Sequence, residues 1–188
     1  MKKSIALAVL ACFAALTAVS QDRNLANEKP FTFGGRVGLN YSTVSTIGGD
    51  RIEARGGIQL GILSRIRIRR NFYFRPELAY SLQGVSAPGY GYLNMNYLTM
   101  PLLLEYGRKF NIQAGLQGGY LLSATSDGWI ETSSLSTYEM SGVAGVAYWV
   151  NEHFSIGFRY TVGFTNLFKD SSEDTTSRVI YTYVAYTF

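Results

Sequence analysis

The sequence has few of the side chains on which metal and thiol chemistry depend. Its 188 residues include one cysteine, Cys12, and one histidine, His153. Structural zinc sites take four Cys or His ligands, and a disulfide needs two cysteines. Composition therefore excludes these sites, and we expect no metal-binding, cofactor-binding or catalytic residues.

Charge is also scarce, at 16% of residues, and no apolar run reaches the ~20 residues of a membrane-spanning helix. The run Ile5–Leu16 follows two lysines and precedes the small residues Ala18-Val19-Ser20. This pattern is typical of a secretory signal peptide, so we expect residues 1–20 to be cleaved. A lipoprotein signal at Cys12 is the competing interpretation, but the apolar run continues past the cysteine.

Loss of residues 1–20 would remove Lys2 and Lys3 and lower the formal net charge from +4 to +2. A charge this small gives no reason to expect a nucleic-acid partner. An exported chain without cysteine fits an oxidising compartment in which the fold must hold without disulfides.

Glycine and aromatic residues are abundant, with 20 Gly, 14 Tyr and 11 Phe. From Phe31 onward, apolar and polar residues alternate, which is the signal of β-strands. The alternating segments lie near residues 31–41, 58–66, 72–83, 93–106, 110–123, 138–150, 154–164 and 180–188. Most of them are longer than a soluble strand of about 5–6 residues and match a tilted transmembrane strand of about 9–11.

We therefore predict an all-β fold, an eight-stranded antiparallel transmembrane β-barrel of OmpX/OmpA-like architecture over residues 31–188. A short periplasmic segment, 21–30, would link it to the signal peptide. Closure removes every unpaired strand edge, which hydrocarbon does not tolerate. Eight strands leave an interior that side chains just fill, so we expect no open pore.

The connections between the segments differ in length. Those predicted to be long lie at 42–53, 84–92, 124–137 and 165–177, and those predicted to be short lie at 67–71, 107–109 and 151–152. Outer-membrane barrels have long extracellular loops and short periplasmic turns. We therefore expect both mature termini in the periplasm, acidic outer loops and basic turns. The terminal Phe188 resembles the signal by which assembly machinery recognises such barrels.

Four stretches resemble the PorT family of outer-membrane β-barrel proteins of Gram-negative bacteria. They are Arg75-Pro76-Glu77-Leu78 with Tyr80–Gly84, Tyr97–Tyr106, Ala114–Ala124, and Phe158-Arg159-Tyr160 with Gly163–Asn166. The resemblance covers roughly residues 31–188. It implies an accessory role in protein secretion across the outer membrane, with a secretion component as protein partner, and it carries over no catalytic residues.

His153 and Ser155 are the candidates for chemistry, because alternation places both on one inward face. A His-x-Ser pair with a carboxylate performs hydrolysis in an outer-membrane lipid A deacylase, and a serine nucleophile needs a base within hydrogen-bond reach. Such an enzyme works on the outer leaflet, however, whereas His153 falls at a predicted periplasmic turn. The alternative interpretation is a turn histidine and a hydroxyl in the lumen.

Six charged residues are also predicted to face inward: Arg36, Arg75, Arg159, Glu77, Glu105 and Glu139. They could form a ligand or ion path, but we favour a polar plug, because buried charges need partners.

Other features have simpler interpretations. The acidic run Asp170–Asp174 lacks the spacing of a calcium loop. Trp149 is predicted to lie inside, and Gly89–Tyr92 forms an aromatic loop suited to partner contact. Five tyrosines are predicted to face lipid or the membrane interfaces: Tyr80, Tyr106, Tyr120, Tyr148 and Tyr160.

The function predicted from the sequence is that of a non-enzymatic outer-membrane scaffold that contacts lipid and lipopolysaccharide. A lipid-modifying barrel enzyme is the alternative, and a narrow channel is the third.

Overall fold

The computed structural model describes residues 30–45, 53–87, 91–126, 135–166 and 175–188. The predicted signal peptide and most of the predicted segment 21–30 lie outside these residues. Within the described part of the chain, no helix is long and apolar enough to cross a membrane.

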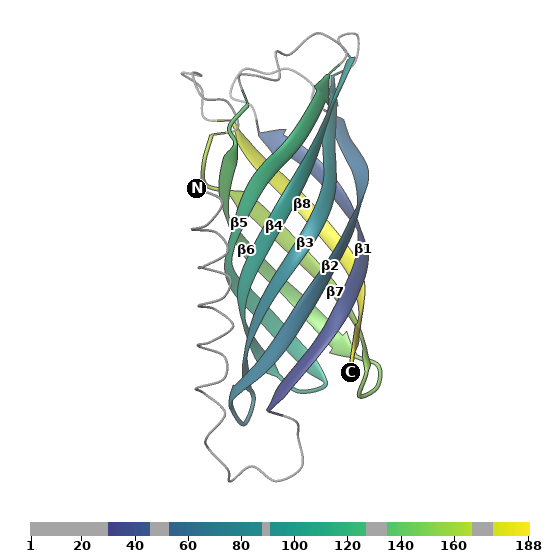
Figure 1. Cartoon of the computed structure of the whole chain (residues 1–188), viewed down its shortest axis with the longest axis vertical. Coiled ribbons are helices and arrows are strands. Elements are labelled where there is room, and N and C mark those ends of the chain that lie inside the picture. The colour runs from purple at the N-terminus through teal and green to yellow at the C-terminus, as the bar shows by residue number, and fades with distance from the viewer. Residues whose placement is uncertain (1–29, 46–52, 88–90, 127–134, 167–174) are drawn as a thin grey trace.

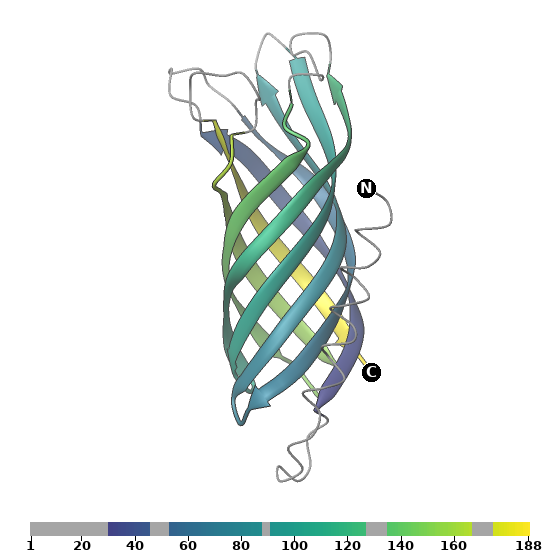
Figure 2. The same ribbon diagram turned by 60° about the vertical axis from the view of Figure 1, so that its left-hand side comes forward.

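Eight strands form one closed antiparallel barrel in which every strand pairs with its neighbours in sequence and β1 pairs with β8. Figures 1 and 2 show the long, tilted strands from two sides. The strands are β1 Phe31–Ser45, β2 Glu53–Arg69, β3 Phe72–Ala87, β4 Gly91–Gly107, β5 Phe110–Ser126, β6 Tyr138–Trp149, β7 Phe154–Gly163 and β8 Thr176–Thr187. The predicted fold class is confirmed.

Alternation decides which side chains face outward. Along β8, buried and exposed residues alternate almost without a break, with Tyr181 and Tyr183 inside and Ile180 and Val184 outside. Large apolar residues such as Leu39, 64% exposed, cover the outer wall. In the outer membrane this wall would contact lipid, because a transmembrane barrel carries its apolar band outside.

Several strands extend further toward the loop end than the alternation predicts. β2, β3, β4 and β5 are 16 or 17 residues long, whereas β7 has 10. The predicted long connection at 84–92 is wrong, because β3 and β4 leave only residues 88–90 between them. Gly84, Ser86 and Gly91 carry no apolar pattern, but their backbones pair across the β3–β4 ladder. β2 to β5 thus form a tall wall on one side of the loop end (Figure 1).

A β-bulge corrects one predicted orientation. Opposite Asn96 and Tyr97, β5 contains one extra residue, because Asn96 pairs with Ser123 whereas Tyr97 pairs with Leu121. One extra residue moves the following side chains to the other face. Ser123, which the alternation of segment 110–123 would turn inward with Asn111 and Gln113, is therefore exposed and accepts a hydrogen bond from Asn96.

The ladder between β2 and β3 is interrupted near the loop end. Its register shifts between Ala54 and Gln59, and the backbone of β3 is instead held by side chains of β1. The Nδ2 of Asn40 donates to the carbonyl of Leu82 at 2.7 Å, and Ser42 bonds the amide and carbonyl of Gly84. The glycines of β2 have no side chains, so the side chains of β1 can reach across them to β3. The resulting bonds satisfy backbone groups that a regular ladder would pair.

The opposite end has short connections, and both described ends of the barrel lie there. The β4–β5 turn begins at Gly107, whose φ of 123° favours glycine. The turn end carries the predicted basic residues, with Arg69 at the end of β2, Arg70 after it, and Arg108 and Lys109 after β4.

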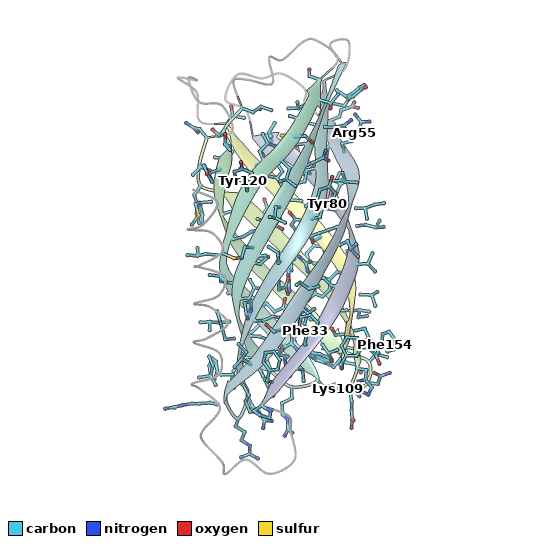
Figure 3. All side chains as sticks on the ribbon, viewed as in Figure 1. Phe33, Arg55, Tyr80, Lys109, Tyr120 and Phe154 are labelled. Carbon is cyan, nitrogen blue, oxygen red and sulfur yellow. The ribbon has the colours of Figure 1, made fainter. Side chains whose placement is uncertain are left out.

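Aromatic residues form a belt near each end of the outer wall. In Figure 3, Tyr80 and Tyr120 lie toward the loop end, and Phe33 and Phe154 lie toward the turn end. The five tyrosines that the sequence predicted to face lipid are all exposed. Aromatic girdles at both interfaces are the usual pattern of membrane barrels.

Candidate functional site

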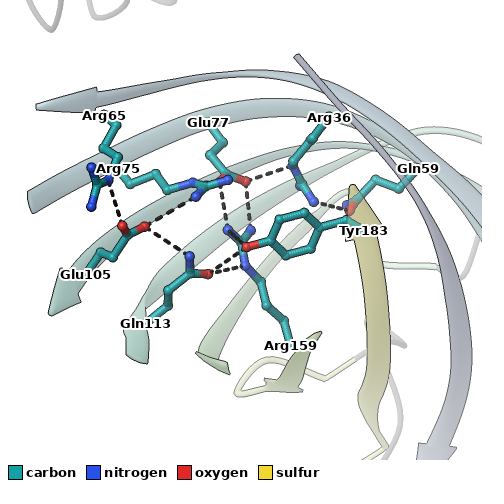
Figure 4. Close-up of polar contacts among 9 residues, drawn as sticks. All are labelled: Arg36, Gln59, Arg65, Arg75, Glu77, Glu105, Gln113, Arg159 and Tyr183. Carbon is teal, nitrogen blue, oxygen red and sulfur yellow. Dashed lines mark hydrogen bonds and ion pairs between the residues drawn. The ribbon is translucent and has the colours of Figure 1, made fainter. Parts of the chain in front are cut away.

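The candidate site is the cluster of charged side chains that the strands direct into the lumen. Alternate positions of β1, β3, β4 and β7 bring Arg36, Arg75, Glu77, Glu105 and Arg159 together, each at most 4% exposed. Their predicted inward orientation is confirmed. We call these residues, with Gln59, Arg65, Gln113 and Tyr183, the ion-pair plug (Figure 4).

Glu77 is the centre of the plug. Its carboxylate lies 2.8 Å from Nε of Arg36 and 2.6 Å from Nε of Arg75. Arg159 donates two hydrogen bonds of 2.8 Å to it, one from each Nη. Glu77 lies on β3 and Arg159 on β7, half the circumference apart, so this bidentate pair crosses the lumen.

Glu105 forms a second centre nearer the turn end. It accepts a hydrogen bond of 2.6 Å from Nε of Arg65, and it pairs with Nη1 of Arg75 at 3.3 Å. Nε2 of Gln113 donates to the same carboxylate at 3.0 Å. Because Arg75 contacts both Glu77 and Glu105, the two centres form one network.

Uncharged side chains complete the network. Nη1 of Arg36 donates to Gln59 at 2.6 Å, and Oε1 of Gln113 accepts from Nε of Arg159 at 2.8 Å. The Tyr183 hydroxyl donates to the same Oε1 at 3.1 Å, and its ring lies 4.6 Å from the guanidinium carbon of Arg159. The plug thus draws on every strand except β6.

Sequence reasoning did not single out these uncharged members. Alternation places Gln59 and Gln113 inward, but neutral amides give no signal that distinguishes a network member from any other lumen residue. Arg65 has the same inward parity and joins through Glu105. Glu139 is also inward, as predicted, but its described hydrogen-bond partner is Ser177, outside the plug.

The plug can close the lumen and hold the strands in register. Buried charges are tolerated when they are paired and hydrogen-bonded, and removal of one partner leaves an uncompensated charge. Both glutamates are paired with arginines, although the four arginines outnumber the two glutamates. Among the described residues, no group of three or more His, Cys, Asp or Glu side chains could hold a metal ion.

His153 and Ser155 lie as the alternative interpretation has them, a turn histidine and a hydroxyl in the lumen, and not as a catalytic pair. His153 is exposed in the turn before β7, where its Nδ1 lies 2.8 Å from the carbonyl of Thr187 and its ring stacks on Tyr186. The Ser155 hydroxyl is buried, with no hydrogen-bond partner among the described residues. A nucleophilic serine requires a base within hydrogen-bond reach, and this geometry lacks one.

The remaining predicted features divide between confirmed and untested ones. Trp149 lies inside the turn end, near Arg65, as predicted. Of the run Gly89–Tyr92, the last two residues belong to β4 and the first two lie outside the described residues. The acidic run Asp170–Asp174 also lies outside them, so its role is untested.

Solved structures share this fold at low sequence identity. The chain resembles Neisserial surface protein A, with 14% identity, a TM-score of 0.58, and coverage of 83% of this chain and 97% of that chain. It resembles OprG of Pseudomonas aeruginosa, with 18% identity, a TM-score of 0.52, and coverage of 88% and 99%. It also resembles Ail of Yersinia pestis, with 11% identity, a TM-score of 0.52, and coverage of 85% and 100%. No curated protein matches it in sequence.

A family model gives the assignment in sequence. The model described as outer membrane protein beta-barrel domain matches residues 19–169, which is most of the chain. The match includes β1 to β7 and therefore nearly the whole barrel. The chain thus belongs to the outer membrane protein beta-barrel domain family and is an outer-membrane β-barrel protein.

Proposed function

We propose that this protein is a closed, non-enzymatic scaffold of the outer membrane that presents its loop end to a protein partner. The observation that carries the proposal is the Glu77–Arg159 pair across the lumen. Such a pair, with the side chains that contact it, obstructs the lumen and supports a closed barrel. Its working surfaces are then its two ends and its outer wall.

The loop end is the surface best suited to a partner. A strand needs about 9–11 residues to cross the membrane, and β2 to β5 have 16 or 17. The surplus projects as the tall wall, with Tyr92 and Arg55 stacked on its loop-end part at 4.7 Å. The PorT resemblance makes a secretion component the first candidate partner. The outer wall contacts lipid and lipopolysaccharide, and Phe188 contacts the assembly machinery.

The orientation belongs to the same proposal. Three short turns, two of them basic, and both ends of the barrel would face the periplasm, and the tall wall would face outward. The only cysteine of the chain lies in the predicted signal peptide. Labelling of a variant with one introduced cysteine therefore shows on which side of the membrane that position lies. In whole cells, a membrane-impermeant maleimide should label Glu53→Cys on the rim and spare Asn151→Cys in a turn. The reverse pattern would invert the orientation.

The scaffold role is tested by cross-linking in the native membrane. A photo-reactive phenylalanine at Tyr92 should capture a specific protein, whereas the same group at Leu60, on the outer wall, should capture lipid or nothing. Secretion components at Tyr92 would support the role that the PorT resemblance implies. Absence of any protein adduct at the rim would overturn the scaffold proposal.

Two further measurements test the other function classes. In planar bilayers the purified barrel should give no steady conductance steps, and such steps would contradict a closed lumen. A His153→Ala strain should keep the lipid A acylation pattern of the parent strain. Altered lipid A in that strain would favour a lipid-modifying enzyme instead.

A further inference from the structure

The turn end of the lumen contains a cavity of about 560 Å³, which we call the turn-end vestibule. Small-molecule sites usually occupy about 300–1,000 Å³. The residues that matter for its chemistry are Arg65, Tyr73, Arg108, Lys109, Trp149 and Glu152. The vestibule therefore combines three cations with one acidic side chain, and the rings of His153 and Phe188 line it beside those of Tyr73 and Trp149.

Arg65 is fixed in place at the border between the vestibule and the plug. Its Nε bonds Glu105 at 2.6 Å, and its guanidinium carbon lies 3.3 Å from the centre of the Tyr73 ring and 5.0 Å from that of Trp149. Its Nη2 and the indole Nε1 of Trp149 are buried donors with no acceptor among the described residues. A buried donor without a partner costs free energy, which an incoming acceptor would recover.

The plug itself carries an excess of positive charge toward this cavity. Four of its members are arginines, Arg36, Arg65, Arg75 and Arg159, and two are glutamates, Glu77 and Glu105, which leaves two positive charges uncompensated. Charges in a site with low-dielectric walls focus their field into the adjoining cleft. Arg65 belongs to both the plug and the lining, so the rest of the plug adds one excess positive charge to those of Arg65, Arg108 and Lys109.

We propose that the turn-end vestibule binds an oxyanion, a carboxylate or phosphate group carried by a water-soluble molecule. Arg65, Arg108 and Lys109 supply the charge, and Tyr73 and Trp149 form the walls. The vestibule lies at the mouth of the lumen, because inward-facing Thr32, Tyr73 and Thr187 line it. Lipid headgroups surround the outer wall, so the aqueous phase is the source that fits. The proposal rests on the closed lumen proposed above, since the plug is the floor of the site.

Fluorescence of Trp149 provides a direct test on the whole barrel in detergent or bilayers. The chain has two tryptophans, so Trp129→Phe leaves Trp149 as the sole reporter. Titration with sodium phosphate, and separately with acetylated di-aspartate, should each give a saturable change at constant ionic strength. The ratio of the two dissociation constants shows whether phosphate or carboxylate is preferred.

A matched pair of variants separates a site from general surface charge. Arg108→Gln with Lys109→Gln removes two cations of the lining and should weaken binding about tenfold or more. Arg69→Gln with Arg70→Gln removes two exposed cations from the neighbouring turn and should change it less than about twofold. Neither pair belongs to the plug, so both should fold.

Two outcomes would overturn the proposal. One is the absence of any saturable change with either anion, and the other is an equal loss in both double variants. The conductance measurement stays independent of these results. No binding in a barrel that also conducts no ions would retire the vestibule as a site and leave the closed lumen intact.

Discussion

The two halves of the lumen are filled in different ways. Toward the turn end the interior is the ion-pair plug, centred on Glu77 and Glu105. Toward the loop end the interior includes an apolar cluster of buried side chains, most of them on the inner face of the tall wall, beside neutral polar residues such as Gln83. We call this the loop-side cluster, and its members are Val85, Leu93, Met95, Tyr97 and Leu135.

The contrast shows that the lumen of one small barrel can be filled by ion pairs in one part and by apolar side chains in another. In the plug, direction matters, because each guanidinium must reach a particular carboxylate. In the loop-side cluster only volume and burial matter, since apolar contacts are non-directional. Leu135, from the connection before β6, is 2% exposed and is held by this cluster. The plug therefore fixes strands relative to one another, and the cluster anchors a connecting segment.

The largest effect is expected from the centre of the plug. Glu77→Ala leaves three arginines facing one another without their shared carboxylate, so we expect the free energy of unfolding to fall by about 3–5 kcal/mol. Denaturant titration of the barrel in lipid or detergent measures this change. Glu53→Ala, on the exposed rim, serves as the control and should have little effect. An unchanged unfolding midpoint for Glu77→Ala would refute the structural role of the plug.

A cavity in the loop-side cluster should lower the free energy of unfolding by somewhat less. Leu93 is fully buried, and Leu93→Ala should lower the free energy of unfolding by about 3 kcal/mol. Leu60→Ala, on the outer wall, is the control, because lipid can fill the space that it leaves. The double variant Glu77→Ala with Leu93→Ala should be additive to within about 0.5 kcal/mol. A larger coupling would mean that the two halves form one cooperative unit.

The interrupted β2–β3 ladder should respond to a single methyl group. A Cβ at Gly57 would collide with the carbonyl of Leu82 and lie 2.6 Å from Oδ1 of Asn40. Gly57→Ala should therefore destabilise by about 1–3 kcal/mol, as overpacking usually does. Gly118→Ala is the matched control, because a Cβ there meets nothing described within 4 Å. Equal unfolding midpoints for the two variants would show that the crowding is relieved at no cost.

The smallest effect concerns the side chain that bridges the same gap. Ser42 donates to the carbonyl of Gly84 at 2.7 Å and accepts from its amide at 2.9 Å. Ser42→Ala should lower the free energy of unfolding by about 1 kcal/mol and speed hydrogen exchange at the Gly84 amide. Exchange at Thr99, in a continuously paired part of β4, should stay as in the parent. Uniform acceleration would point to global destabilisation rather than to local opening.

Much of the site could be predicted, because the face of the sheet on which a side chain lies depends only on the local sequence. The alternation around Arg75 and Glu77 fixes which side of the sheet they occupy, and the structure confirms it. Their partners could not be predicted, because Glu77 and Arg159 are 82 residues apart and meet only when β3 and β7 lie opposite each other. Ser123 was assigned to the wrong face because a single extra residue in β5 shifts the alternation. The turn position of His153 could also be predicted, whereas its contact with the carbonyl of Thr187 could not.

The sequence by itself determined the number of strands, the apolar outer face and, outside the bulge in β5, the side chains that face the lumen. Each of these follows from the period of two along an extended backbone, which needs no knowledge of other strands. The tertiary structure decided the bulges, the tall wall, the ion-pair plug and the vestibule beneath it. These depend on register and on which strands stand opposite, and a closed barrel fixes both only when all eight strands are paired.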